Sequence, residues 1–564
     1  MTGPGSGTTL VAPAPEAGAR TRGPRTWLAA VVLAGLGVVL PILVADNFGA
    51  LGIPRGDDVA YLSSAFRFFD DGIINGSGWA AMNLVGQLVA ALPVIAIAGH
   101  SITALQIEAA LIGFVGLWAV YDLAGQVLSR SSALFVAVLV AVNPIWLQMA
   151  PTYLTDVPAF SLAMASLALG ARALLSERHR AGLLVASFTV GFAAYTIREF
   201  ALVAPISVAV VAVGVSGRRR DRLVALIGLG VLVTVAVAFF AWRRGLPGFI
   251  TQDVRTPTSA TVTKVATRLA HSLVLLGVLV TPALILAGPG RLVRAAWTRA
   301  RITTAVVLSC FAVTALIESV RGGHDNGFIT PDHYNANQWT IEEGYRPLLL
   351  SEIGVVLKIV GVVAVAVMLC AVIPAIFDTI THAGSRYSRA TRSPVRAVVV
   401  VCAAGYVMVY LASSVAGISF FSRYVLPLVP LVAILILVPR RADAGPHSLA
   451  TTCAVASLVL LGSIGTIAAA ANASLDGAKF AVAEQAARAL GSKDLVDGGL
   501  EWNNVRIGEV RYPQGYSPPD ACARVRFAST LPTGDAVLGR ERIWTVGKDL
   551  WLVARPTRPC PDEP

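Results

Sequence analysis

The chain has 564 residues, of which 55% are hydrophobic and only 14% are charged. A soluble core could not bury that much apolar surface, so the composition predicts an all-α polytopic membrane protein. The net charge of +12 does not indicate nucleic-acid binding, because most of the arginines lie in short loops between apolar runs, where they orient membrane helices.

The first apolar run, residues 27–45, is long enough to cross a bilayer. Arg20, Arg22 and Arg25 precede it, and arginines beside a span tend to stay in the cytoplasm. Residues 1–25 are rich in Gly, Pro and Thr and are expected to form a disordered cytoplasmic tail. The chain after residue 45 should therefore emerge on the outer side of the membrane.

Alternating the later apolar runs across the bilayer keeps the arginine clusters of the connecting loops on the cytoplasmic side and predicts 13 spans with an external C-terminus. The later runs are 102–127, 131–150, 157–175, 182–197, 200–215, 223–242, 268–288, 302–319, 350–376, 396–415, 424–439 and 449–471. Residues 83–99 are nearly long enough to cross, but a span there would invert every later loop. We therefore interpret them as re-entrant or juxtamembrane.

This threading divides the chain into a transmembrane domain, 26–471, and an extracytoplasmic domain, 472–564. The outer loops of the first are 46–82, 151–156, 243–267 and 320–349. The second is expected to be a small α/β domain, with a helix over 478–490 and short strands at 525–529, 542–546 and 549–554. Cys522 and Cys560 both lie in it, and a disulfide between them is expected outside the cytoplasm.

Two adjacent acids, Asp57 and Asp58, follow the first span in the sequence Pro-Arg-Gly-Asp-Asp-Val-Ala-Tyr. Carboxylates that face a substrate cavity at a membrane surface are suited to general-base or metal chemistry. The alternative is structural, since Asp57 could cap an amphipathic helix over 58–70.

Asp156, in Thr-Asp-Val-Pro, opens the fourth span on the same side. It is a second candidate for catalysis, or else a helix cap ahead of Pro158. Four arginines lie on this side against the charge trend and are candidates to bind the phosphate of a lipid-linked donor, because the planar guanidinium matches phosphate oxygens: Arg198, Arg243, Arg244 and Arg423. The alternatives are a local ion pair for Arg198 with Glu199 and snorkelling to lipid headgroups for the others.

The 320–349 loop is rich in His, Asp, Tyr and Trp, and long loops of this kind are usually functional. We expect it to cover the substrate, with the acceptor contacted by His324, Asp332, His333 and Tyr345. The histidines and acids of this loop could also hold a divalent metal, although no spacing among them requires one.

The order of these motifs, ending in Arg-Tyr-Val-Leu-Pro-Leu-Val-Pro at 423–430, resembles the GT-C superfamily over residues 27–440. Within it the chain is similar to the polyprenyl-phosphate mannosyltransferases of family 39 and the aminoarabinose transferases of family 83. The resemblance implies an integral-membrane enzyme that moves a sugar from a polyprenyl-phosphate donor to an extracytoplasmic glycan, lipid or protein. It also implies that Asp57, Asp58 or Asp156 acts as the base or positions the acceptor, sometimes with a divalent metal. Many members have Asp-Glu where this chain has Asp57 and Asp58.

Two other classes combine many spans with polar outer loops. A transporter or flippase for lipid-linked saccharides tends to show repeated halves and ionisable groups near the bilayer midplane, and no repeat is evident here. A polysaccharide polymerase or ligase also carries a large outer loop, but tends to lack the early pair of acids.

Overall fold

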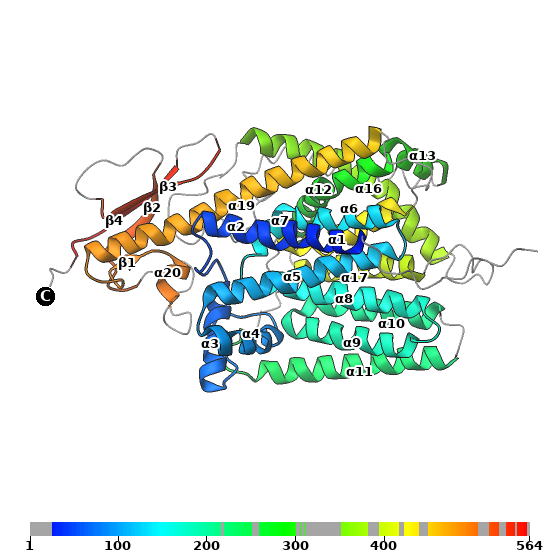
Figure 1. Cartoon of the computed structure of the whole chain (residues 1–564), viewed down its shortest axis with the longest axis horizontal. Helices are drawn as coiled ribbons and strands as arrows, with labels where there is room; N and C mark the ends of the chain where they lie inside the picture. The colour runs from blue at the N-terminus through cyan, green and yellow to red at the C-terminus, as the bar shows by residue number, and fades with distance from the viewer. Residues whose placement is uncertain are drawn as a thin grey trace, which may run out of the picture.

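The apolar runs fold into a bundle of long helices, and a small sheet is attached at one end of the bundle (Figure 1). The computed structural model describes residues 25–215, 219–250, 259–299, 305, 311, 351–381, 394–416, 422–438, 449–505, 518–528, 537–546 and 550–560. In Figure 1 most of the bundle helices run horizontally, and the sheet lies beyond their left end, near the C-terminus.

The N-terminal half supplies most of the helices around the site described below. They are α1 (Arg25–Ala34), η1 (Gly35–Val39), α2 (Leu40–Asn47), α3 (Asp58–Asp71), α4 (Val85–Ala98), α5 (Ile102–Gly125), α6 (Arg130–Ala141), α7 (Pro144–Met149), α8 (Asp156–Leu175), α9 (Arg180–Ile197), η2 (Glu199–Leu202), α10 (Val203–Val215) and α11 (Arg219–Arg244). Helices α1, η1 and α2 follow one another without a break. The predicted span 131–150 is divided into α6 and α7, because Asn143 caps α7 through the Ile145 N–H and Pro144 occupies its first turn.

The C-terminal half completes the bundle and builds the sheet. Its elements are α12 (Ser259–Ala287), α13 (Pro289–Arg299), α16 (Ser351–Thr381), α17 (Pro394–Val415), η5 (Ser422–Val425), α18 (Leu428–Leu437), α19 (Leu449–Ala489), β1 (Val496–Asp497), α20 (Leu500–Asn504), β2 (Ala523–Ala528), β3 (Gly539–Ile543) and β4 (Leu550–Pro556).

The membrane assignment is confirmed by these helices. Within the described residues, nine helices are long and apolar enough to cross a bilayer, and four apolar helices are shorter. Every predicted span coincides with helical residues except 302–319, which lies almost wholly outside the described residues. The protein is a mostly helical, multi-pass membrane protein.

Helix α4 corresponds to the segment that was predicted not to cross. It has 14 residues, which at 1.5 Å per residue is about 21 Å, against about 30 Å for the hydrocarbon core. It packs against α3, α5 and α9 at one end of the bundle.

Helix α19 differs from the expected pattern. The last predicted span, 449–471, and the predicted helix at 478–490 form one helix of 41 residues, Leu449–Ala489. Figure 1 shows this long orange helix running from the bundle to the sheet. The predicted domain boundary after residue 471 therefore falls inside a continuous helix.

The C-terminal sheet has the strand order β1-β2-β4-β3. Strand β1 is parallel to β2, and the other pairs are antiparallel. Alternate residues, including Val525, Phe527 and Leu552, are buried against α19 in a second, smaller core. A disulfide joins Cys522, just before β2, to Cys560, just after β4. The small α/β unit expected at the C-terminus is therefore present.

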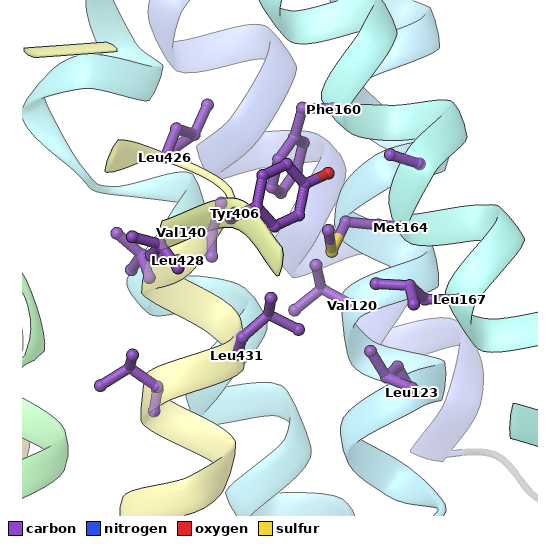
Figure 2. Close-up of a cluster of buried hydrophobic side chains, with 14 of the residues drawn as sticks. Val120, Leu123, Val140, Phe160, Met164, Leu167, Tyr406, Leu426, Leu428 and Leu431 are labelled. Atoms are coloured by element: carbon purple, nitrogen blue, oxygen red, sulfur yellow. The ribbon is translucent and has the colours of Figure 1, made fainter. Parts of the chain in front are cut away.

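Figure 2 shows part of the main core, where side chains from α5, α6, α8, α17 and α18 point toward one another. Phe160 and Met164 of α8, Val120 of α5 and Leu431 of α18 all belong to this core. Phe160 lies one turn beyond Asp156 on α8. The packed core thus fixes the helix that presents this acid at its first residue.

Candidate functional site

Two acids and two arginines that lie far apart in the sequence form one buried cluster. The Oδ2 atom of Asp57 lies 3.4 Å from a terminal nitrogen of Arg423. The Nε atom of Arg423 lies 3.3 Å from Oδ1 of Asp156, whose Oδ2 lies 3.0 Å from a terminal nitrogen of Arg198. The four side chains therefore alternate in charge, in the order Asp57, Arg423, Asp156, Arg198.

Each member of this acid–arginine cluster comes from the end of an element. Asp57 immediately precedes α3, Asp156 is the first residue of α8, Arg198 follows α9, and Arg423 lies in η5, just before α18. In Figure 1, α3 runs across the direction of the long helices, at the end of the bundle nearer the sheet. The contacts show that these four positions lie at one end of the bundle, as the threading of the sequence requires.

Both arginines of the cluster are buried. Arg423 is only 2% exposed and Arg198 only 3%. Burial lowers the pKa of Arg198, but the Asp156 carboxylate together with Tyr424 and Tyr61 more than offsets this effect, and the pKa of Arg198 lies above its ordinary value. Arg198 also donates from Nε to the Thr155 hydroxyl, at 2.6 Å. Both guanidinium groups are therefore fixed cations with little access to bulk water.

The geometry disfavours the capping alternative for Asp57. Asp57 occupies the N-cap position of α3, but its side chain forms no capping hydrogen bond there. Instead, its Oδ1 accepts a hydrogen bond from the indole N–H of Trp79 at 2.9 Å, and its other oxygen faces Arg423. The carboxylate is directed into the cluster rather than along its own helix.

Asp58 has a different environment. Its two oxygens accept the backbone N–H groups of Arg55 and Tyr153, and the residue is fully buried. Burial raises the pKa of the Asp58 carboxyl, and the two backbone donors oppose that rise. Asp58 thus ties the loop before α3 to the segment before α8, and its carboxylate does not belong to the chain of ion pairs.

Two aromatic residues that the sequence reasoning did not select complete the cluster. Tyr61, one turn into α3, is fully buried, and its hydroxyl has no hydrogen-bond partner within the described residues. Burial raises its pKa, and the charges that act on it are those of the four cluster residues. Trp79 orients Asp57. The spacing Asp57-x-x-x-Tyr61 in a predicted helix was a usable signal for the tyrosine, because residues four apart share a face.

The segment around α4 forms hydrogen bonds with the two segments that lead to Asp156 and Arg198. Gln87 and Tyr153 exchange hydrogen bonds, from the Gln87 amide to the Tyr153 carbonyl at 2.8 Å and from the Tyr153 hydroxyl to the Gln87 carbonyl at 3.2 Å. The Asn83 amide donates to the Tyr195 carbonyl at 2.6 Å. These contacts give the short helix α4 a clear structural role beside the site.

The other two predicted phosphate-binding arginines lie elsewhere. Arg243 is buried, but it donates to the backbone carbonyl of Met82 at 2.6 Å and stacks over Phe249. Arg244 is exposed and lies over the ring of Phe240. No contact that the structure gives joins either of them to the cluster, so their predicted role has no geometric support. The predicted acceptor-contacting residues His324, Asp332, His333 and Tyr345 lie outside the described residues.

A second polar network contacts the loop that carries Asp57 and Asp58, and the sequence did not predict it. Arg55 contacts Asp476, and Glu501 contacts both Gly56 and Lys479. The C-terminal partners are separated from the first loop by more than 400 positions, so no local pattern could reveal them. The arginine itself was visible, since it stands in the same short motif as the two acids.

The donor set fits proton transfer and anion binding better than metal binding. Both acids of the cluster face guanidinium groups at the distances given above, so their oxygens are already paired with cations. In the part of the chain that the structure describes, no three or more His, Cys, Asp or Glu side chains are grouped to hold a metal. We therefore assign no step at this cluster to a metal.

Comparison with known proteins adds a family match. Residues 84–242 match the family model of dolichyl-phosphate-mannose-protein mannosyltransferases. This confirms, for that segment, the resemblance seen in the sequence. The matched segment contains Asp156 and Arg198, while Asp57 and Arg423 lie on either side of it. No curated protein matches the chain.

Among solved structures, the chain is similar to ArnT from Cupriavidus metallidurans bound to undecaprenyl phosphate, with 13% identity, a TM-score of 0.38, and 96% of this chain and 100% of that chain covered. It is also similar to the Archaeoglobus fulgidus oligosaccharyltransferase in the apo form, with 13% identity and a TM-score of 0.43, covering 81% of this chain and 57% of that one.

Proposed function

We propose that the protein is a membrane glycosyltransferase of the GT-C type, which transfers a sugar from a polyprenyl-phosphate donor to an acceptor hydroxyl outside the cytoplasm. The observation that carries this proposal is the buried cluster, in which Arg423 lies between Asp57 and Asp156. The family match over residues 84–242 supports a donor of the polyprenyl-phosphate sugar class.

In the proposed reaction, Asp57 is the general base. It is the cluster acid with the greater exposure, 8% against 3% for Asp156, and the Trp79 indole fixes its orientation. As the acceptor oxygen bonds to the anomeric carbon, Asp57 takes the hydroxyl proton and the bond from that carbon to the phosphate oxygen breaks. A single displacement of this kind inverts the anomeric centre.

Polyprenyl phosphate leaves with one more negative charge than the bound donor carried. Arg423 and Arg198 are placed to balance that charge, since each guanidinium has five N–H donors. The Tyr61 hydroxyl, buried beside the same charges, supplies a further hydrogen bond. Asp156 holds both arginines in place and thereby sets where the phosphate is bound.

The proposal is tested with a panel of hexosyl and pentosyl polyprenyl phosphates, radiolabelled in the sugar, beginning with mannose. Purified protein is added to membranes that lack it, and label is counted in the acceptor fraction. Asp57→Asn should lower transfer by about 100-fold or more, the usual contribution of a general base. Asp70→Asn, an exposed acid on the same helix, should transfer at the wild-type rate.

Wild-type protein that transfers no sugar from any donor of the panel would contradict the function. Wild-type turnover by Asp57→Asn would contradict only the role of that acid.

A further inference from the structure

The loop that presents Asp57 is held by side chains from the C-terminal part of the chain. The Gly56 N–H donates to Oε1 of Glu501 at 3.0 Å. One residue earlier, the Nε atom of Arg55 lies 2.7 Å from Oδ2 of Asp476. The two acids come from α20 and from the end of α19 nearer the sheet. Both residues that directly precede Asp57 are therefore anchored to one distant segment.

The anchor at Gly56 acts where the backbone changes direction. Gly56 has φ +60°, in the left-handed region that glycine adopts far more readily than other residues. The peptide N–H at this turn is the last backbone donor before Asp57. Fixing it fixes the direction in which the Asp57 side chain leaves the loop.

Glu501 is itself held by a buried cation. Its second oxygen, Oε2, lies 2.8 Å from Nζ of Lys479, and the side chains of the pair are 5% and 3% exposed. Lys479 lies three residues after Asp476 on α19, so the two share a face of that helix. Glu501 thus links the ammonium group of Lys479 on α19 to the backbone of the loop before α3.

The burial of these ion pairs costs free energy that is not explained if they serve only to attach the C-terminal segment to the bundle. Buried ion pairs lose much of their attraction to desolvation, and apolar contacts attach domains more cheaply. Such contacts are already present, since Ala473 of α19 packs with Ala45 of α2 and with Ala50 in the loop after it. The polar network adds a defined position for the loop backbone, which apolar contacts do not supply.

We propose that Glu501, supported by Lys479, is a positioning residue for the general base: it sets the Gly56 peptide and through it the place of Asp57 in the cluster. This inference rests on the function proposed above. The C-terminal segment is then part of the active-site structure, and its displacement would switch the base off without touching the donor-binding arginines.

Two double variants isolate the Gly56 hydrogen bond. Both Lys479→Met/Glu501→Gln and Lys479→Met/Glu501→Ala remove the ion pair, but only the glutamine keeps an oxygen that can accept the Gly56 N–H. Glu484→Gln is the matched control, because Glu484 also lies 2.8 Å from a lysine, Lys493, in the same segment, away from the loop. All are made in the full chain.

Hydrogen exchange of the peptide covering residues 54–64 is measured first, without substrate. Exchange should be at least about fivefold faster in the alanine double variant and within about twofold of wild type in the glutamine double variant and the control. With the donor identified by the panel, kcat of the alanine double variant should fall at least about tenfold at nearly constant donor KM, since a misplacement of 1 Å can cost about 100-fold.

Equal exchange and equal kcat in the two double variants would overturn the inference. Parallel losses of kcat, donor affinity and Tm in both double variants would also overturn it. The exchange experiment needs no activity, so its outcome is independent of the proposed reaction. If Asp57→Asn kept wild-type turnover while exchange followed the expected pattern, the reaction would be wrong and the anchoring of the loop right.

Discussion

Asp57 and Asp58 are neighbours in the sequence with unlike environments. The Asp57 carboxylate faces a side-chain cation and an indole, whereas both oxygens of Asp58 accept backbone N–H groups. From the sequence, either acid was a candidate for catalysis. Nothing in a run of two identical residues tells which one turns inward to the backbone. That difference depends on where Tyr153 lies, 95 positions away.

Asp58→Asn should therefore lower stability. The amide nitrogen cannot accept a hydrogen bond, so one buried backbone donor is left unpaired, at a cost of about 1–3 kcal/mol in the free energy of unfolding. Thermal unfolding in detergent measures this, with Asp70→Asn as the exposed control. A melting curve for Asp58→Asn that overlays the wild type would contradict the scaffolding role.

Tyr61→Phe should separate function from stability. Because the buried hydroxyl has no partner in the described part of the chain, its removal should leave Tm unchanged or raise it. The hydrogen bond proposed for the phosphate is lost, and donor turnover should fall about tenfold. A lowered Tm with unchanged turnover would show instead that the hydroxyl serves the fold.

Arg423→Lys should raise the donor KM about tenfold, since one ammonium group cannot reproduce the contacts of a planar guanidinium with two carboxylates and a phosphate. Arg244→Lys is the control, because Arg244 is exposed and stacks only on Phe240 among the contacts given for it. Unchanged donor KM in Arg423→Lys would remove the arginine from the phosphate site.

At the scale of elements, the cluster depends on how closely α5 and α8 approach. A Cβ atom on Gly116 of α5 would lie 2.7 Å from the Cα atom of Ser161 on α8. Glycine is therefore required for this helix contact rather than for a turn. Since α8 begins with Asp156, the spacing of the two helices also places that acid.

Gly116→Ala should push the helices apart and destabilise the protein by about 1–3 kcal/mol, with a loss of turnover. Gly125→Ala on the same helix is the control, because its Cβ would meet only Ala133 at an ordinary 3.8 Å. Its effect should stay within about 1 kcal/mol, favoured by helix propensity. Equal Tm values for the two variants would contradict the role of Gly116 in the α5–α8 contact.

Periodicity and hydropathy predicted most helices correctly, because apolar runs of this length have few other stable conformations. They did not predict that the apolar run 449–471 and the helix at 478–490 form one continuous helix, α19. Gly477 lies within this helix, where it approaches the backbone just after α2 so closely that a Cβ would lie 2.3 Å from the Phe48 carbonyl oxygen. The glycine is therefore explained by a tertiary contact that the sequence alone does not reveal.

For the whole molecule, the threading of the sequence predicts that Asp57, Asp156, Arg198 and Arg423 lie on one side of the membrane. The positive-inside rule was sufficient for that, since it uses only loop charges. It could not predict the order of the ion pairs or the anchoring of the first loop by Glu501. Those depend on tertiary contacts between residues hundreds of positions apart.

The central claim is that the acid–arginine cluster operates outside the cytoplasm, and sided cysteine labelling of intact cells tests it most directly. In a background without Cys310, Cys370, Cys402 and Cys453, single cysteines replace three exposed residues: Asp71 at the end of α3, Glu541 in β3, and Glu177 between α8 and α9. An impermeant maleimide should label positions 71 and 541 from outside and position 177 only after permeabilisation. Labelling of position 177 in intact cells, with position 71 protected, would contradict the account.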